Sequence, residues 1–283
     1  MRFSLLGPLE AAGESGPVPL GGINQRAVLG FLLLHANSVV PTSDLVRALW
    51  GGDVPATARK MVQNAVAGLR RVLAEDDSVE LLTAQPGYAL RVDPERIDVT
   101  RFHALVDRGR AEYRREAWEA AARWLRQAVA LWRGCALADV VESGDADWPE
   151  LAVLNETRLT ALEDSLEAEL ALGLHHELIG EMTALVKEEP TRERLSGLLM
   201  LALYRCGRQQ EALAVYKHLR DVLRECYGLD PAPKLRGMEQ AILNQSPCLA
   251  LPQMVPQRAF DAAGVTIGAD AGSTTDWGKR PAR

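Results

Sequence analysis

The feature that most constrains the fold of this chain is an apolar pattern that recurs at helical spacing in its second half. The segment Leu178–Leu185 has apolar residues at its first, fifth and eighth positions, and the segment Ala212–Leu219 repeats this pattern 34 residues later. A third copy, Ala121–Ala128, precedes the first of these by 57 residues. Residues at such spacing share one face of a helix. A chain with these repeats is expected to stack helices so that each buries one face against its neighbours.

The 34-residue period is typical of tetratricopeptide repeats, in which two helices form one unit. Pro190 follows the middle copy where such a helix must end, and Gly207–Ala212 resembles the turn inside a unit. The longer interval before it indicates an insertion around Gly134–Trp148. Because the pattern is helical almost throughout from Ile97 to Leu243, we expect an all-α tetratricopeptide-like helical-repeat domain with a concave groove. A helical bundle with some internal similarity is the alternative.

The first 92 residues combine strand, helix and turn signals. They predict a strand at Met1–Leu9 and then a loop or hairpin at Gly13–Gly22. Three helices follow: Asn24–Ala36, a helix capped by Thr42 or Ser43 that ends at Trp50, and Pro55–Glu75. Val79–Val92 is predicted to form two strands with a turn at Pro86-Gly87. Three short helices followed by a β-ribbon are the order of a winged helix. This part is therefore expected to be an α+β winged-helix domain.

The third of these helices has two chemically different faces. Apolar residues at i, i+3 and i+4 spacing form the face expected to pack on a core: Val62, Ala65, Val66, Leu69, Val72 and Leu73. The opposite face carries residues that include side chains suited to phosphates and base edges: Lys60, Gln63, Asn64, Ala67, Arg70 and Arg71. A helix in a DNA major groove requires such a face. A solvated amphipathic helix, with its arginines paired to Glu75, has the same residue types and is the plain alternative.

Charge is distributed unevenly along the chain. Residues 1–92 have 8 basic and 8 acidic residues, whereas residues 93–245 have 20 basic and 27 acidic residues. The helical part is therefore a poor nucleic-acid binder, and any phosphate contact is expected in the N-terminal part. Residues 246–283 lose periodicity and are rich in Pro, Gly, Ser, Thr and Ala, which predicts a disordered tail.

Motifs of enzymes, cofactor sites and metal sites are missing from this sequence. It has no G-x-S-x-G, no glycine-rich dinucleotide loop and no HExxH, so we expect no catalytic residue and no cofactor. The four cysteines form no CxxC pair, and the adjacent His175 and His176 point in different directions on a helix, so no metal site is expected. No apolar stretch approaches the roughly 18 residues of a membrane span, and no signal peptide is expected, because the apolar run after Met1 ends at Gly7-Pro8. These features favour a cytoplasmic protein without membrane contact.

Eight segments carry a resemblance to a known family. Four lie in the N-terminal part, Leu20–Leu29, Leu45–Gly51, Leu69–Leu73 and Gly87–Leu90, and four in the helical part, Ile97–Phe102, Ala130–Gly134, Met200–Leu213 and Tyr227–Pro231. Through them, residues 1 to about 245 resemble the Streptomyces antibiotic regulatory protein family in its small, stand-alone form. The resemblance implies an OmpR-type winged-helix DNA-binding domain at 1–92, a bacterial transcriptional activation domain at 97–245 and the tail at 246–283.

The resemblance also implies a function and its partners. It implies a transcriptional activator of a secondary-metabolite (antibiotic) gene cluster, acting at the nucleoid. Such a protein binds direct repeats near promoters as a side-by-side dimer and contacts RNA polymerase holoenzyme. No phospho-acceptor domain is expected, and no ATPase module, since G-x-x-x-x-G-K-[ST] is missing.

The same resemblance assigns roles to residues around the third helix. Its polar face would contact DNA. From their own positions, Thr57 at the start of the helix is expected to offer its hydroxyl to a phosphate, and Arg91 in the second wing strand is expected to meet the DNA backbone or the minor groove. The loop before this helix would face polymerase: Trp50, Gly51, Gly52 and Asp53. The plain alternatives are a helix N-cap for Thr57, an exposed strand residue for Arg91 and a core residue for Trp50.

The third helix departs from the family pattern at two positions. Members usually have Val-Ser-Arg-Leu-Arg near its end, where this chain has the run from Val66 to Arg70 with Ala67 and Gly68 inside it. A hydroxyl and a guanidinium are thus missing, and a glycine weakens an exposed helix by roughly 1 kcal/mol relative to alanine. With the balanced charge of residues 1–92, these departures support a second hypothesis: a helical-repeat protein-interaction scaffold with a degenerate winged helix.

Overall fold

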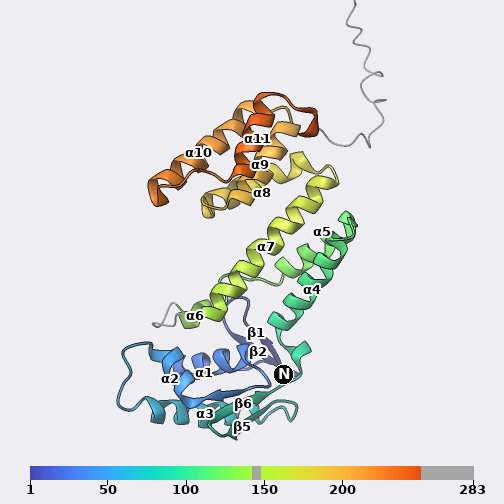
Figure 1. Ribbon diagram of the computed structural model, residues 1–283. Helices are drawn as coiled ribbons and strands as arrows, with labels where there is room; N and C mark the ends of the chain where they lie inside the picture. The colour runs from blue at the N-terminus through green and yellow to red at the C-terminus, as the bar shows by residue number, and fades with distance from the viewer. Residues whose placement is uncertain (142–147, 250–283) are drawn as a thin grey trace, which may run out of the picture. The chain divides into compact units, whose positions relative to one another are not determined.

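The computed structural model describes residues 1–141 and 148–249. Its N-terminal part contains two small antiparallel sheets and three helices, which confirms the winged-helix architecture (Figure 1). The strands run in the orders β1-β2-β3 and β4-β6-β5. The elements are β1 (Arg2–Ser4), β2 (Glu10–Gly13), β3 (Gly16–Pro17), α1 (Ile23–Leu34), β4 (Val39–Pro41), α2 (Thr42–Trp50), α3 (Ala58–Leu73), β5 (Glu80–Ala84) and β6 (Gly87–Arg91). A short 3-10 helix at Pro94–Arg96 follows them. The β5–β6 hairpin is the wing.

The first strand is shorter than the sequence predicts. Only Arg2–Ser4 pairs with β2, and the chain then leaves the sheet. The backbone N–H groups of Leu5 and Leu6 donate to the carboxylate of Asp98, at 2.8 and 3.0 Å. Burial raises the pKa of Asp98, although these backbone hydrogen bonds oppose the rise. A side chain from 92 residues further along thus replaces the strand partner that Met1–Leu9 was expected to have.

The start of α2 also differs from the prediction. The N-cap position is Pro41, and neither Thr42 nor Ser43 caps the helix. Thr42 instead donates to the carbonyl of Pro86, because Val39–Pro41 forms the unpredicted strand β4 beside β6. The pairing brings the Val40 carbonyl so close to Gly87 that any Cβ at that position would overlap it. Glycine is therefore required where the wing meets β4.

The second part is helical. Its elements are α4 (Asp98–Tyr113), α5 (Trp118–Val129), α6 (Ala138–Val141), α7 (Pro149–Ala171), α8 (His175–Glu188), α9 (Glu193–Arg205), α10 (Gln209–Tyr227), α11 (Pro233–Leu243) and a 3-10 helix at Pro247–Leu249. The three copies of the repeated pattern lie on α5, α8 and α10, and their members are buried except for the half-buried Leu185. This confirms the tetratricopeptide-like helical repeat. No helix in the described ranges is long and apolar enough to cross a membrane.

Helix α7 holds the helical part together through buried charge. Glu163, Asp164 and Glu169 of α7 are only 4%, 8% and 8% exposed. They accept hydrogen bonds from arginines on three neighbouring helices and the loop before α9: Arg110 and Arg194 to Asp164, Arg192 to Glu163 and Arg126 to Glu169. Hydrogen bonds to the carboxylates raise the pKa of Arg126 and Arg192 further. Each buried carboxylate is thereby compensated.

The segment between α5 and α7 completes the core of the winged helix. Leu137, Val140 and Trp148 are at most 2% exposed and belong to the same hydrophobic cluster as α1 and α3. The indole N–H of Trp148 donates to the carbonyl of Ala48 at 2.8 Å, and its ring meets Phe31 edge-on at 5.2 Å. The sequence predicted an insertion here; the structure shows that its ends pack on α1 and α2. Residues 142–147 lie outside the described part.

The last described residues differ from the predicted tail. Residues 246–249 continue from α11 into the 3-10 helix at Pro247–Leu249, and Leu249 packs on the core of the repeats. Its carbonyl accepts a hydrogen bond from Arg205 Nε at 2.9 Å. The prediction of disorder is therefore wrong for these four residues, because α9 supplies a partner. The remainder of that prediction, residues 250–283, lies outside the described residues.

Candidate nucleic-acid interface

Helix α3 is anchored on one face and open on the other. All six residues of the predicted polar face are exposed: Lys60, Gln63, Asn64, Ala67, Arg70 and Arg71. On the inner face, the predicted core residues are at most 4% exposed except for the half-buried Val72: Val62, Ala65, Val66, Leu69 and Leu73. Burial of this face fixes the rotation of the helix. The polar face is then presented as a fixed array of donors and positive charges.

Arg70 lies on the wing side of this array and is already engaged. Its Nε donates to the carbonyl of Leu81 at 2.9 Å, and its Nη2 donates to Thr83 Oγ1 at 2.7 Å. Both acceptors belong to β5, so Arg70 ties α3 to the wing. The solvated-helix alternative expected this arginine to pair with Glu75, but its hydrogen bonds in the described part of the chain go to β5. Its remaining N–H groups are left for an outside acceptor.

Two other cations of the face are free within the described structure. Among residues 1–141 and 148–249, no hydrogen bond or ion pair engages the side chains of Lys60 and Arg71. The same holds, in that part of the chain, for Arg59, which is exposed in the first turn of α3. Sequence reasoning did not single out Arg59, although its place beside Lys60 was a usable signal. Unpaired cations on a rigid helix suit phosphate groups, because no internal ion pair must break first.

Thr57 and Arg91 lie at the ends of neighbouring elements. Thr57 is exposed at the N-cap position of α3, but its side chain does not cap the helix; its hydroxyl lies 3.6 Å from Met61 Sδ. Arg91 is exposed at the end of β6, opposite Glu80 of β5. The N–H of Ala58, the first of α3, donates to the carbonyl of Pro55 at 2.9 Å, so an anion at this end would meet the next N–H groups, those of Arg59 and Lys60, which have no side-chain cap.

The predicted polymerase-facing loop connects α2 to α3. Trp50 is half-buried and packs on the winged-helix core, as its plain alternative expected. Gly51 ends α2 with a φ of 53°, a left-handed value that favours glycine. Gly52 and Asp53 are exposed, and the N–H of Asp53 donates to the carbonyl of Trp50 at 3.0 Å. The loop is thus a compact exposed turn held at one end by a tryptophan.

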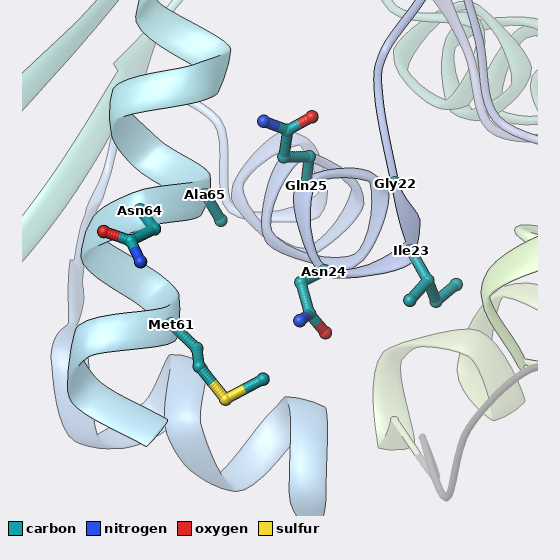
Figure 2. Close-up of a pocket in the computed structure, with 7 residues that line it drawn as sticks. All are labelled: Gly22, Ile23, Asn24, Gln25, Met61, Asn64 and Ala65. Carbon is teal, nitrogen blue, oxygen red and sulfur yellow. The ribbon is translucent and has the colours of Figure 1, made fainter. Parts of the chain in front are cut away.

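An open groove lies between the start of α1 and α3 (Figure 2). Its volume is about 430 Å³, and the amides of Asn24, Gln25 and Asn64 line it with the apolar Ile23 and Met61. Asn64 also belongs to the exposed face of α3, so the groove continues that face toward α1. Sequence reasoning missed this groove because it joins residues from two elements about 40 positions apart.

Gly68 lies on the α1 side of α3 and is buried. A Cβ at Gly68 would overlap the amide of Gln25, and a Cβ at Gly21 would overlap the other end of the same amide. The expectation that Gly68 lies on an exposed part of the helix is therefore wrong, because the Gln25 side chain covers this position from α1. Ala67, by contrast, is exposed as expected.

Comparison with known proteins adds independent information. Residues 97–243 match the bacterial transcriptional activator domain, and residues 20–90 match the C-terminal domain of transcriptional regulatory proteins. The chain is 35% identical to regulatory protein DnrI of Streptomyces peucetius, over 87% of this chain and 93% of DnrI. It is 38% identical to regulatory protein AfsR of Streptomyces griseus over 90% of this chain, but it spans only 26% of AfsR.

A solved structure has the same architecture. Mycobacterium tuberculosis EmbR, in complex with a low-affinity phosphopeptide, superposes with a TM-score of 0.80 at 35% sequence identity. The match covers 87% of this chain and 65% of the EmbR chain. Both domain matches occur in the order that the structure shows, and the match to DnrI runs over nearly all of that regulator. The chain belongs to the Streptomyces antibiotic regulatory protein family, in which an OmpR-type winged helix precedes a bacterial transcriptional activator domain.

Proposed function

We propose that this chain is a sequence-specific, DNA-binding transcriptional activator of a secondary-metabolite (antibiotic) gene cluster. The observation that carries the proposal is the exposed face of α3, where Lys60 and Arg71 have no partner in the described part of the chain. Its relatives DnrI and AfsR are named regulatory proteins, which supports a regulatory role. In this proposal residues 1–92 bind DNA, and residues 97–245 support the complex that forms on it.

The proposed mechanism follows the geometry of the winged helix. Helix α3 enters a major groove, the wing with Arg91 meets the adjacent backbone, and Thr57 lies near a phosphate at the start of α3. Two protomers bind side by side on direct repeats near a promoter. The loop Trp50–Asp53 then faces RNA polymerase holoenzyme, and the protein acts in the cytoplasm at the nucleoid. In this proposal the protein recruits RNA polymerase and catalyses no reaction itself, so no residue is assigned a catalytic role.

A second candidate is a protein-interaction scaffold with a degenerate winged helix. Arg70 favours it, because two of the N–H groups of this cation already donate to β5 and fewer are left for DNA. The balanced charge of residues 1–92 also favours it. Under this hypothesis the groove of the helical repeats binds a protein, and α3 is an ordinary solvated helix.

Fluorescence anisotropy separates the two candidates. The full chain is titrated into labelled promoter DNA with direct repeats and into a scrambled duplex, each at two salt concentrations. The activator hypothesis expects tighter binding to the repeats and weaker binding at higher salt. No binding to either duplex at low salt would favour the scaffold.

A further inference from the structure

We propose that the groove between α1 and α3 binds the sugar–phosphate backbone of one DNA strand, with Gln25 as its central contact. The inference rests on the proposed DNA-binding function and adds a residue from α1 to the interface. The groove differs from the polar face of α3 in that its donors are uncharged amides from two helices.

The half-buried side chain of Gln25 is confined between two glycines. Gly21 and Gly68 flank its amide so closely that a Cβ on either residue would overlap it. Within residues 1–141 and 148–249, however, no hydrogen bond engages the amide. Asn24 and Asn64 on the same groove likewise have no side-chain hydrogen bond to the described residues. These three amides line one groove without a hydrogen bond to the described residues, which leaves their donors for a ligand.

The position of the groove indicates which part of DNA it meets. A helix with its side chains is about 10–12 Å across, and a major groove is about 12 Å wide, so the flanks of an inserted helix face the two backbones. Arg70 and β5 occupy one flank of α3. The opposite flank carries Met61, Ala65 and Gly68 and adjoins Gln25. Gln25 therefore lies where the second backbone passes.

The chemistry of the lining fits a sugar–phosphate chain. The amide N–H groups of Asn24, Gln25 and Asn64 donate to phosphate oxygens, and Ile23 and Met61 offer apolar surface to deoxyribose. No carboxylate lines the groove, so an entering phosphate meets no like charge there. Figure 2 shows Gln25 on α1 and Asn64 on α3, on the two sides of this space.

A charge series at Gln25 tests the inference in the full chain by anisotropy. Gln25→Ala is expected to weaken binding roughly tenfold on promoter and scrambled DNA alike, because a backbone contact carries no sequence information. Gln25→Glu is expected to weaken it further, and Gln25→Lys to bind at least as tightly as the unaltered chain. The same three changes at Gln127, exposed on α5, are the matched control and should leave each affinity within about twofold.

Gly68→Ala gives an independent test, since its Cβ must displace the Gln25 amide. It is expected to reproduce the loss seen with Gln25→Ala, with no further loss in the double variant. Thermal melting checks that each variant folds. Equal effects of Glu and Lys at position 25, or no effect of any change there, would overturn the inference while DNA binding stands. An unaltered chain that binds neither duplex would overturn both this inference and the proposed function.

Discussion

At the scale of single residues, the two arginines near the end of α3 have different surroundings. Arg71 is exposed and unpaired within the described structure, whereas Arg70 bonds to Leu81 and Thr83 of the wing. Arg71→Ala is expected to weaken binding to specific and random DNA equally and to reduce the slope of log K against log salt by about 1. Arg70→Ala is expected to differ from Arg71→Ala in that it also lowers the free energy of unfolding by about 1 kcal/mol, because two hydrogen bonds to β5 are lost.

Anisotropy at several salt concentrations and chemical denaturation measure these two effects. Arg114→Ala, which removes an exposed arginine from the C-cap position of α4, is the control and should change neither quantity. An Arg71 variant that loses affinity only for promoter DNA would show instead that Arg71 reads a base.

His175 predicts a pH dependence of stability. It is 4% exposed, its Nε2 lies 3.2 Å from Arg205 Nη1, and burial together with this charge lowers its pKa below 6.5. The unfolded chain therefore binds more protons than the folded chain as the pH falls below 6.5, so the free energy of unfolding falls with pH. His175→Gln is expected to flatten this decline between about pH 7 and pH 5.

Denaturation curves across this pH range provide the measurement. His218→Gln, on the exposed side of α10, should leave the decline as steep as in the unaltered chain. His103, whose pKa burial also lowers, is present in both variants and contributes the remaining slope. An unchanged decline in His175→Gln would show that the buried imidazole does not control stability in acid.

At the scale of elements, α6 and Trp148 connect the helical part to the winged helix. Trp148 contributes a buried ring against Phe31 and one hydrogen bond to Ala48, two residues before the end of α2. Trp148→Phe retains most of the ring packing and is expected to destabilise the chain by about 1 kcal/mol. Trp148→Ala also leaves a cavity and is expected to cost about 3–5 kcal/mol. Chemical denaturation measures both losses. Equal losses would contradict a separate contribution from the packing of the ring, and an unchanged stability of Trp148→Phe would contradict a contribution from the hydrogen bond.

The elements that sequence predicted are those whose own residues determine them. The apolar spacing of α3 and the repeated pattern on α5, α8 and α10 appear in the structure because burial of a helix face depends on local periodicity. Strand β4 depends on pairing with β6 across Gly87, and α6 has only four residues, Ala138–Val141. Both elements are too short to have a periodic signal of their own. Tertiary contacts stabilise them, so they could not be predicted from local sequence.

At the scale of the whole molecule, the candidate interface was predictable only in part. The exposed face of α3 follows from one helical wheel. The groove beside it does not, because Gln25 and Gly68 come together only when α1 packs on α3. Likewise, the sequence predicted DNA contacts for both Arg70 and Arg71, with Arg70 matching the family pattern, and only the position of the wing shows that Arg70 also bonds to β5.

The number of protomers on a promoter should appear in the salt dependence of the whole complex. If each protomer neutralises about six phosphates, log K against log salt has a slope near −5 on a duplex with one half-site. A duplex with two direct repeats should give a slope near −10 for the overall binding of two protomers.

Moving the repeats apart by about 5 base pairs places the second half-site on the opposite side of the helix and is the geometric control. Side-by-side contact predicts that this change removes the cooperativity of the second binding event while each half-site keeps its own slope. Equal overall slopes on the one-site and two-site duplexes would contradict the dimer, because only one protomer would then displace counterions.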